Sequence, residues 1–436
     1  MEYRLRFLVP VILENMTTVA TTLIYSAITG AVSRSSLAAV GVGNQAINLV
    51  CAFFAIVTSG CAVITAADVG RRDLLSASRT VEHTISVSLI SSVLVAAFLL
   101  LVSGFTMKLL MPGAEELFLA EGTLYYRTLL FGLPPMVLFN AMNSVLRAKG
   151  DSRYALFATV VNNAVLLLLV YVFVVRMDMC VKGAALAMVC CRCCAALTSL
   201  FAVLRSREGF HVKLSRVFIF DKAVLGRVLR VGAPVSLSSV AVQIGYVSIN
   251  SLLVSLGTIE AGVANVLNAI QQFTCIGHVI TSYSATTIVG QECGAGNIEK
   301  ARKSTLFIYW VSLGVTLLLC LPAVSFPRFS AGLFSADAET VEAAAALLWL
   351  VIPYSILGQA INALEPAVMA SGDTSYAMKT TVTGVWLIRL PLSLLFCIVL
   401  GWGVRGVYAA NIASFVFRTV MLYVRTVGPR FAAKRI

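Results

Sequence analysis

Charged residues are scarce in this chain of 436 residues: aspartate, glutamate, lysine and arginine together make up 12%. A soluble globular domain carries about 25%, so the composition excludes that class. The three histidines show no metal-ligand spacing, and no GxxxxGK[ST] phosphate-binding loop occurs. We therefore expect no catalytic site, no cofactor and no ATP-driven transport, and we predict that the protein is not an enzyme.

Eleven cysteines are present, but their pattern predicts neither disulfides nor a metal centre. Most lie inside apolar runs, where cysteine behaves as a small hydrophobic residue. The cluster from Cys190 to Cys194 is the exception. On a helix its thiols would spread around the axis instead of converging, so we expect no metal ligands there.

Hydrophobic residues make up 59% of the chain, and its mean hydropathy is +0.91. Apolar runs recur along the whole length, and about 20 residues suffice to cross a bilayer as a helix. Runs such as Ile85–Val102 and Ser304–Leu321 do not alternate as the strands of a membrane barrel would. The pattern predicts an all-α integral membrane protein.

A repeat divides the chain in half. Gly150-Asp151-Ser152 recurs as Gly372-Asp373-Thr374, 222 residues later. Other pairs keep nearly the same spacing, which indicates two copies of one module. These pairs are Asn140 and Asn362 (222), Pro10 and Pro234 (224), Val181 and Val404 (223), and Ala46 and Ala269 (223). We predict an N-terminal lobe over residues 1–210, a cytoplasmic basic linker at 211–227 and a C-terminal lobe over 228–436.

Twelve transmembrane helices are predicted, six in each lobe. An even number per lobe makes the two lobes parallel, related by a pseudo-two-fold axis along the membrane normal. The predicted spans are 7–32, 37–67, 83–110, 122–146, 154–175, 181–204, 228–256, 261–289, 304–325, 340–369, 377–400 and 404–425.

The distribution of lysine and arginine predicts the orientation. With the N-terminus inside, the cytoplasmic segments hold 23 of these residues and the outer segments hold 6, so both termini are expected in the cytoplasm. This rule explains the net charge of +13 better than a nucleic-acid partner does.

The linker is either a solvated segment or an amphipathic one that lies along the membrane surface. Both Gly–Asp loops then face the cytoplasm, where Asp151 and Asp373 are expected to cap the next helix or bond the turn.

Ionisable residues inside membrane spans are costly and are candidates for function. Glu14, beside Asn15 in the first predicted helix, could exchange a proton or supply oxygen ligands to a hard cation. Glu365 and Arg389 lie on successive predicted helices and could pair with each other. Arg192 is the other central arginine of this kind.

Uncharged polar side chains also recur within the predicted helices of both halves. Asn44 and Asn48, like Asn268 and Gln272, are four residues apart and therefore share one face of a helix. Hydrogen bonding between helices explains any one of these residues, but the set predicts a shared, water-accessible cavity.

Three stretches carry a resemblance to a known family. The first predicted helix opens with Pro10-Val11-Ile12-Leu13-Glu14-Asn15 and, after Gly30, is followed by Leu37–Gly41. The fourth ends with Phe139-Asn140 and the loop Leu146–Ser152. The eighth is followed by Gly294–Arg302, which reads Gly-Ala-Gly-Asn-Ile-Glu-Lys-Ala-Arg. With two six-helix halves, the chain resembles the MATE (multidrug and toxic compound extrusion) family over its whole length.

The resemblance implies secondary active export of organic, often cationic, compounds, driven by inward Na⁺ or H⁺ while two lobes rock around a central cavity. Many members carry an aspartate in the first helix five residues before Gly30, where this chain has Tyr25. The acidic position often found in the tenth helix is Gly358, with Tyr354 four residues earlier. Either Glu14 and Glu365 replace these carboxylates, or the coupling differs, or the substrate does.

We predict a multi-pass multidrug antiporter of the inner or plasma membrane, monomeric, with small-molecule substrates, the lipid bilayer as its surroundings and no nucleic-acid partner. The alternative is a flippase for lipid-linked precursors of the same broader superfamily, which would need a basic cavity such as Arg192 and Arg389 could provide. Polar stripes in both halves disfavour a non-transporting receptor or structural protein. The predicted cation-coupling residues are Glu14, Asn15 and Tyr25; the predicted substrate-binding residues are Asn48, Asn140, Tyr246, Asn250, Gln271, Tyr354, Gln359, Asn362, Glu365 and Arg389.

Overall fold

A computed structural model describes residues 2–32, 34–110, 116–205, 212, 221–335, 337–429 and 431. Regular structure in these ranges is helical throughout, without a strand, which confirms the predicted all-α class. The contacts divide the chain into two units, Met1–Ser236 and Leu237–Ile436, and each is described by itself. The predicted linker at 211–227 lies mostly outside the described residues.

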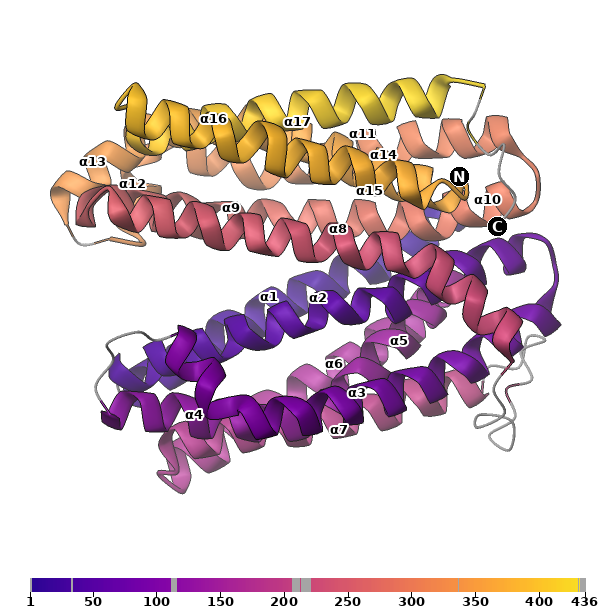
Figure 1. The fold of residues 1–436 in the computed structure, drawn as a ribbon, viewed down its shortest axis with the longest axis horizontal. Helices are drawn as coiled ribbons and strands as arrows, with labels where there is room; N and C mark the ends of the chain where they lie inside the picture. Colours follow the sequence, from indigo (N-terminus) through magenta and orange to yellow (C-terminus); the bar gives the residue numbers. More distant parts are fainter. Residues whose placement is uncertain are drawn as a thin grey trace. The chain divides into compact units, whose positions relative to one another are not determined.

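The first unit is a bundle of long helices that lie lengthwise beside one another (Figure 1). Its core forms around the fully buried Tyr125 and Tyr126, with Leu129, Leu130 and Leu133 close by. The helices are α1 (Glu2–Val32), α2 (Arg34–Gly70), α3 (Leu74–Leu110), α4 (Glu116–Phe131), α5 (Leu133–Lys149), α6 (Ser152–Val170) with the π-helical segment η1 (Tyr171–Arg176), α7 (Cys180–Arg205) and the beginning of α8 (Lys222–Ser255).

The second unit repeats this succession of helices. Its core gathers around Leu267, Leu348 and Val351. The elements are the rest of α8, α9 (Thr258–Ser284) with η3 (Ala285–Val289) and α10 (Gly290–Gly294), α11 (Ile298–Ser325), α12 (Pro327–Gly332), α13 (Ala338–Leu347) with η4 (Leu348–Leu350) and α14 (Val351–Ala370), α15 (Thr374–Val382) with η5 (Thr383–Arg389), α16 (Leu390–Leu394) and η6 (Leu395–Val399), and α17 (Gly403–Val427). Eleven of the twelve predicted spans each fall on one helical run, and the twelfth, 122–146, falls on two helices, α4 and α5.

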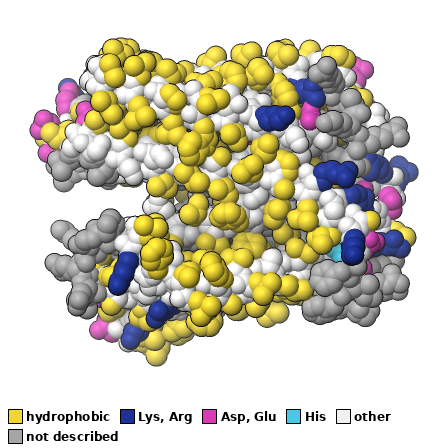
Figure 2. All heavy atoms as spheres, in the orientation of Figure 1, with side chains coloured by type: hydrophobic (Ala, Val, Ile, Leu, Met, Phe, Trp, Pro, Cys, Tyr) yellow, Lys and Arg dark blue, Asp and Glu magenta, His cyan; other side chains and the backbone are white. Residues whose placement is uncertain are grey.

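Large apolar side chains are exposed along these helices. Leu101 is 85% exposed, and Phe105, Leu318 and Leu387 are each more than 70% exposed. The face drawn in Figure 2 is hydrophobic along the helices and carries its charged side chains mostly near their ends. Among the described residues ten helices are long and apolar enough to cross a membrane, or eleven with one bent pair counted as a span. Lipid, not water, is the environment that such a surface fits.

The bent pair is α4 and α5, which the sequence predicted as one helix over 122–146. The two helices meet at Gly132 with a bend of 51°. Pro134 and Pro135 occupy the first turn of α5, where proline is tolerated because the first N–H groups of a helix have no intrahelical partner. Inside a continuous helix the same prolines would remove hydrogen bonds, so the span breaks here.

The two Gly–Asp loops form tight turns at the C-terminal ends of α5 and α14. Gly150 and Gly372 have φ values of 100° and 92°, and their N–H groups bond carbonyls of the preceding helix at 2.8 and 3.0 Å. The aspartates that follow do not cap the next helix with their side chains. Asp151 pairs with Lys149 at 3.2 Å, and Asp373 pairs with Arg425. The predicted capping of the next helix is therefore wrong, and these carboxylates form ion pairs near the helix ends.

The left-handed backbone at these turns gives a simple stability prediction. Gly150→Ala should lower the free energy of unfolding by about 1–2 kcal/mol, because a Cβ is strained at positive φ. Thermal unfolding of the purified protein in detergent measures this effect. Gly104→Ala is the control, since it lies within α3 with open space around it and should be neutral or slightly stabilising. Equal melting temperatures for Gly150→Ala and Gly104→Ala would contradict the expectation.

One helix crossing in the first unit depends on two glycines. A Cβ on Gly60 of α2 would lie 2.9 Å from the carbonyl oxygen of Val228, and a Cβ on Gly232 of α8 would overlap the carbonyl of Ile56. The Ser236 hydroxyl donates to the backbone carbonyls of α2 beside this crossing, at 3.0 and 3.1 Å. The backbones of α2 and α8 therefore approach closely, as small residues allow in membrane bundles.

Candidate functional site

The predicted coupling residue Glu14 forms a buried ion pair. It lies on α1 inside a span over Phe7–Ile28 and is 6% exposed. Its Oε1 accepts a hydrogen bond from Arg147 Nη1 at 2.8 Å and another from the Thr159 hydroxyl at 3.0 Å. Arg147, at the end of α5, is 8% exposed. The long side chain of Arg147 is buried in the bundle, and its guanidinium lies beside the Glu14 carboxylate.

The Glu14 site has two acceptor oxygens that remain open. Asn143 Nδ2 donates to the Thr159 hydroxyl at 3.1 Å, which links this amide to Glu14 through one threonine. Glu14 Oε2 and Asn143 Oδ1 are buried, and neither has a hydrogen-bond partner among the described residues. Buried oxygens without partners are costly, and a proton or a small cation would satisfy them. We call Glu14, Asn143, Arg147 and Thr159 the Glu14 site.

Glu365 has an arginine partner too, but not the predicted one. Its carboxylate accepts from Arg418 Nη2 on α17 at 2.7 Å and from the Thr381 hydroxyl on α15 at 2.7 Å. Arg418 also donates to Thr381 at 3.0 Å. The expected pair of Glu365 with Arg389 is wrong, because α17 supplies an arginine that already occupies the carboxylate.

The two carboxylate sites share one position of the repeat. Thr159 and Thr381 are 222 residues apart, as are Asn143 and Glu365. In both units the threonine bonds a carboxylate that an arginine also holds. The carboxylate belongs to Glu14 of α1 in the first unit and to Glu365 of α14 in the second. The threonine therefore occupies the same repeat position in both units, whereas the carboxylate comes from a different helix in each.

Arg389 lies instead in a cluster of aromatic side chains in the second unit. Its guanidinium carbon is 4.5 Å from the centre of the Tyr246 ring. Tyr246 and Tyr354 are close enough to interact through their hydroxyl groups, and the rings of Tyr354 and Tyr408 are 6.0 Å apart. Gln271 Nε2 donates to the Tyr408 hydroxyl at 2.7 Å. Four predicted substrate-binding residues thus meet, and with Tyr408 they form what we call the Arg389 cluster.

Tyr25 belongs to a separate polar cluster in the first unit. Its hydroxyl is 3.1 Å from that of Tyr125, which donates to Asn44 Oδ1 at 3.2 Å. Arg192 of α7 is close enough to interact electrostatically with both tyrosines. Tyr25 and Glu14 are eleven residues apart on α1, or about 16 Å along a helix. The structure therefore does not bring these two predicted coupling residues together.

The remaining predicted residues lie outside the Glu14 site, the Arg389 cluster and the polar cluster around Tyr25. Asn48 and Asn250 are exposed, and Asn140 is half-buried. The amides of three others donate to backbone carbonyls: Asn15 and Asn362 within their own helices, and Gln359 to α9, where it also donates to the Thr281 hydroxyl at 2.5 Å. The backbone bonds are Asn15 Nδ2 to Val11 O (2.8 Å), Asn362 Nδ2 to Gly358 O (2.8 Å) and Gln359 Nε2 to Gly277 O (3.1 Å).

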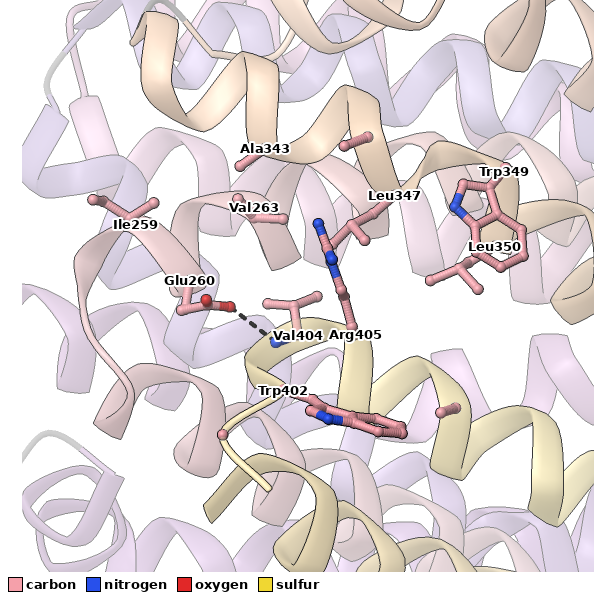
Figure 3. A pocket seen from close by; sticks show the side chains of 13 residues that line it. Ile259, Glu260, Val263, Ala343, Leu347, Trp349, Leu350, Trp402, Val404 and Arg405 are labelled. Carbon is pink, nitrogen blue, oxygen red and sulfur yellow. Dashed lines mark hydrogen bonds between the residues drawn. The ribbon is translucent and has the colours of Figure 1, made fainter. Parts of the chain in front are cut away.

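A cavity of about 710 Å³ opens elsewhere in the second unit, between the beginnings of α9 and α17 and the turn from α13 to α14 (Figure 3). It contains none of the predicted site residues. Trp349, Trp402 and Arg405 line it, while Glu260 turns its carboxylate to the Val404 N–H at 2.9 Å. Glu260 therefore stabilises the first turn of α17.

Sequence reasoning missed the partners in these sites. Arg147 lies just beyond the predicted span 122–146, and Arg418 lies within the predicted span 404–425, in an apolar stretch of α17, without being among the predicted site residues. The rule that singled out Glu14 would have found Arg418. Thr159, Thr381 and Tyr408 carry no comparable signal, because hydroxyl groups are common in membrane helices.

Comparisons with known proteins agree on one family. The MatE family model matches residues 10–172 and 234–395. The "Probable multidrug resistance protein YoeA" of Bacillus subtilis is 22% identical over 96% of this chain and 91% of its own length. An outward-facing multidrug resistance MATE family transporter of the MOP superfamily has a similar structure, with a TM-score of 0.90, 21% identity and coverage of 99% and 96%. A MOP superfamily transporter from Pyrococcus furiosus, described as having a binding pocket of reverse polarity that suggests a different function, gives a TM-score of 0.89 at 21% identity, with coverage of 97% and 94%.

Proposed function

Because the chain belongs to the MatE family, we propose that this multi-pass membrane protein is a secondary active exporter of small organic compounds, driven by antiport of H⁺ or Na⁺ through alternating access. The observation that carries the proposal is the Glu14 site, where a carboxylate within a membrane span is paired with Arg147 and keeps one oxygen open. The name of the Bacillus relative, which refers to multidrug resistance, supports export.

The coupling step follows from the contacts of Glu14. A proton on Oε2 would neutralise the carboxylate, so that the attraction to Arg147 falls and the arginine can move. Na⁺ would act through the same place, since Glu14 Oε2 and Asn143 Oδ1 are oxygen ligands of the kind that hard cations prefer. Either ion then favours one arrangement of α1 and α5 over another, which is the differential binding that any coupled conformational change requires.

The orientation is part of the proposal. We assign both termini and both Gly–Asp turns to the cytoplasmic face of the plasma membrane, because lysine and arginine are concentrated in those segments. Arg147, three residues before Gly150, then lies near the cytoplasmic end of α5. The Glu14 site would exchange its ion with the cytoplasm after transport, and the protein would work as a monomer without a cofactor.

A flippase for lipid-linked precursors is the second candidate. Its supporting observation is the pair of central arginines, Arg192 and Arg389, neither of which has a carboxylate partner among the described residues. A flippase would move a labelled lipid phosphate between leaflets of a vesicle without exporting soluble dyes.

Glu14→Gln should abolish gradient-driven export, because glutamine keeps the shape but cannot release a proton or neutralise Na⁺. The measurement is dye export from proteoliposomes under an imposed pH gradient and, separately, under a Na⁺ gradient. The gradient that drives the wild type identifies the ion. Exchange of dye without a gradient should persist in Glu14→Gln, since that exchange does not need the coupling ion.

Glu342→Gln is the matched control, since it makes the same chemical change at a carboxylate that is 64% exposed at its side chain. It should export at the wild-type rate. Full gradient-driven export by Glu14→Gln would remove this residue from the mechanism. Loss of export in both variants would point to a general effect on the protein.

A further inference from the structure

Arg389 is buried without a counter-ion among the described residues. Arg389 is 4% exposed and lies within the span Thr374–Val399, fifteen residues after its beginning and ten before its end. Its guanidinium lies over the Tyr246 ring, with Tyr354 and Tyr408 close enough to interact electrostatically. Its Nε has no hydrogen-bond partner among the described residues. Arginine remains protonated in proteins, so this is a permanent positive charge in a low-dielectric place.

Among the described residues, no carboxylate forms an ion pair with this charge. Eight acidic residues occur between residues 237 and 436, and the nearest in sequence, Asp373, pairs with Arg425. Glu292 and Glu339 lie in the short α10 and in the first turn of α13, at helix ends. The other five are engaged: Glu260 with the Val404 N–H, Glu299 with Lys303, Asp337 with Thr340, Glu342 with Arg328 and Glu365 with Arg418.

A cation–π contact does not replace a counter-ion. The penalty for burying an unpaired charge exceeds the attraction of one aromatic ring. Proteins retain such a charge where a ligand completes the pair, and within membrane spans a charge of this kind marks a substrate pathway. The missing partner of Arg389 is therefore an anion that the protein binds from outside its own chain.

The surrounding groups are hydrogen-bond donors suited to an anion. Tyr408 accepts a hydrogen bond from Gln271 Nε2, so its phenolic oxygen is already used as an acceptor and its own O–H is available to donate. Tyr246 and Tyr354 add two more hydroxyls beside the guanidinium. The rings of Tyr354 and Phe415, whose centres are 4.8 Å apart, give the cluster an apolar wall. An organic anion needs this combination of cation, donors and aromatic surface.

We propose that the Arg389 cluster binds the anionic group, a carboxylate or a phosphate, of the compound that the protein transports. The inference rests on the proposed function and narrows its substrates to organic anions. An organic cation would be repelled by an unneutralised guanidinium in this environment.

A separate observation in the first unit also indicates that the transported compound is an anion. Tyr25 stands where the resemblance implies an aspartate, and beside it lies Arg192, whose buried Nη1 has no partner among the described residues. The polar cluster around Tyr25 therefore also offers a positive charge and neutral hydroxyl groups in place of a carboxylate.

The experiment measures binding and transport separately. Binding of 6-carboxyfluorescein, an anionic aromatic dye, is followed by fluorescence polarisation with purified protein in detergent, and gradient-driven transport of the same dye is measured in proteoliposomes. Ethidium is the cationic comparison. The wild type should bind and export the anionic dye in preference to ethidium, and Arg389→Gln should bind it about 10- to 100-fold more weakly, the range for losing charge-assisted hydrogen bonds.

Variants and stability distinguish binding from structure. Arg405→Gln, which removes an exposed arginine of the same unit, should bind the dye like the wild type. Without dye, Arg389→Gln should melt at a temperature equal to or higher than that of the wild type, because an unpaired buried charge is removed. The dye should raise the melting temperature of the wild type and leave that of Arg389→Gln unchanged. A folded Arg389→Gln that binds the anion normally would overturn the proposal.

The outcomes also separate this inference from the proposed function. Export of ethidium without binding of the anionic dye or of a lipid phosphate refutes the anion site and supports export. Arg389-dependent binding of the anionic dye without transport under any gradient supports the site and refutes the exporter. Arg389-dependent movement of a labelled lipid phosphate between leaflets, with the soluble dye neither bound nor moved, supports the anion site with a lipid as its source.

Discussion

Arg418→Met is expected to lower the free energy of unfolding by about 3–5 kcal/mol, the loss found when one partner of a buried ion pair is removed. Glu365 would keep the hydrogen bond from the Thr381 hydroxyl. It would lose the hydrogen bond from Arg418 Nη2, which lies 2.7 Å from its Oε2 and also donates to Thr381. Arg418 is 8% exposed, so water cannot replace it easily. Unfolding of the purified protein in detergent by added SDS measures the change.

A second substitution tests the cause of this loss. Arg418→Met combined with Glu365→Met should recover most of the stability, because no unpaired charge remains and apolar residues often replace a buried pair without cost. Arg328→Met breaks a pair with Glu342 in which both side chains are mostly exposed, and it should have no measurable effect. If Arg418→Met is as stable as Arg328→Met, the buried pair does not contribute as argued.

Gly232→Leu is expected to have the second large effect on folding. Even the Cβ would overlap the carbonyl of Ile56, and the rest of the side chain would force α8 away from α2. Overpacking of a close interface costs about 1–3 kcal/mol and sometimes more. Ser236 would also lose its two bonds to α2 carbonyls. The yield of monodisperse protein and its SDS-unfolding midpoint should both fall.

Gly226→Leu provides the comparison on the same helix. Gly226 has open space around it and lies six residues before Gly232, so the change in helix propensity is the same. It should fold with wild-type yield and midpoint. A difference between the two variants isolates the close approach of the helices, and equal behaviour would show that α2 and α8 separate without cost.

The fold could be predicted in detail because a bilayer imposes simple rules. Length and hydrophobicity placed helical structure at each of the twelve predicted spans, and Gly150 and Gly372 marked two turns that do need positive φ. The break at Gly132 was missed, since an apolar window averages over Pro134 and Pro135. Hydrophobicity reports whether a segment is buried in lipid and is insensitive to a local change of direction.

The candidate sites were harder to predict, because they depend on contacts between distant segments. Glu14 could be selected by its position in an apolar run, but its partner Arg147 is 133 residues away. Glu365 was matched with Arg389 because their helices are consecutive, whereas the bundle brings Arg418 of α17 to it. Which faces of two helices meet is decided by packing of the whole unit, and no local pattern records it.

The π-helical segments account for a small irregularity in the repeat. The spacing between equivalent residues is 222 at Gly150 and Gly372 but 223 at Val181 and Val404, so one more residue lies between these landmarks in the second half. The first half has η1 in this stretch; the second has η6 at the corresponding place and η5 in addition. A π turn closes over five residues where an α turn closes over four, and it can therefore accommodate an inserted residue without breaking the helix.

The extra residue lies inside a membrane span and not in a loop, because the span Thr374–Val399 has 26 residues and its counterpart Ser152–Arg176 has 25. The additional π-helical segment Thr383–Arg389 is the place in this span that would accommodate it. Arg389 is the last residue of that segment. The second copy of the module therefore carries its buried arginine at the point where its helix geometry departs from that of the first copy.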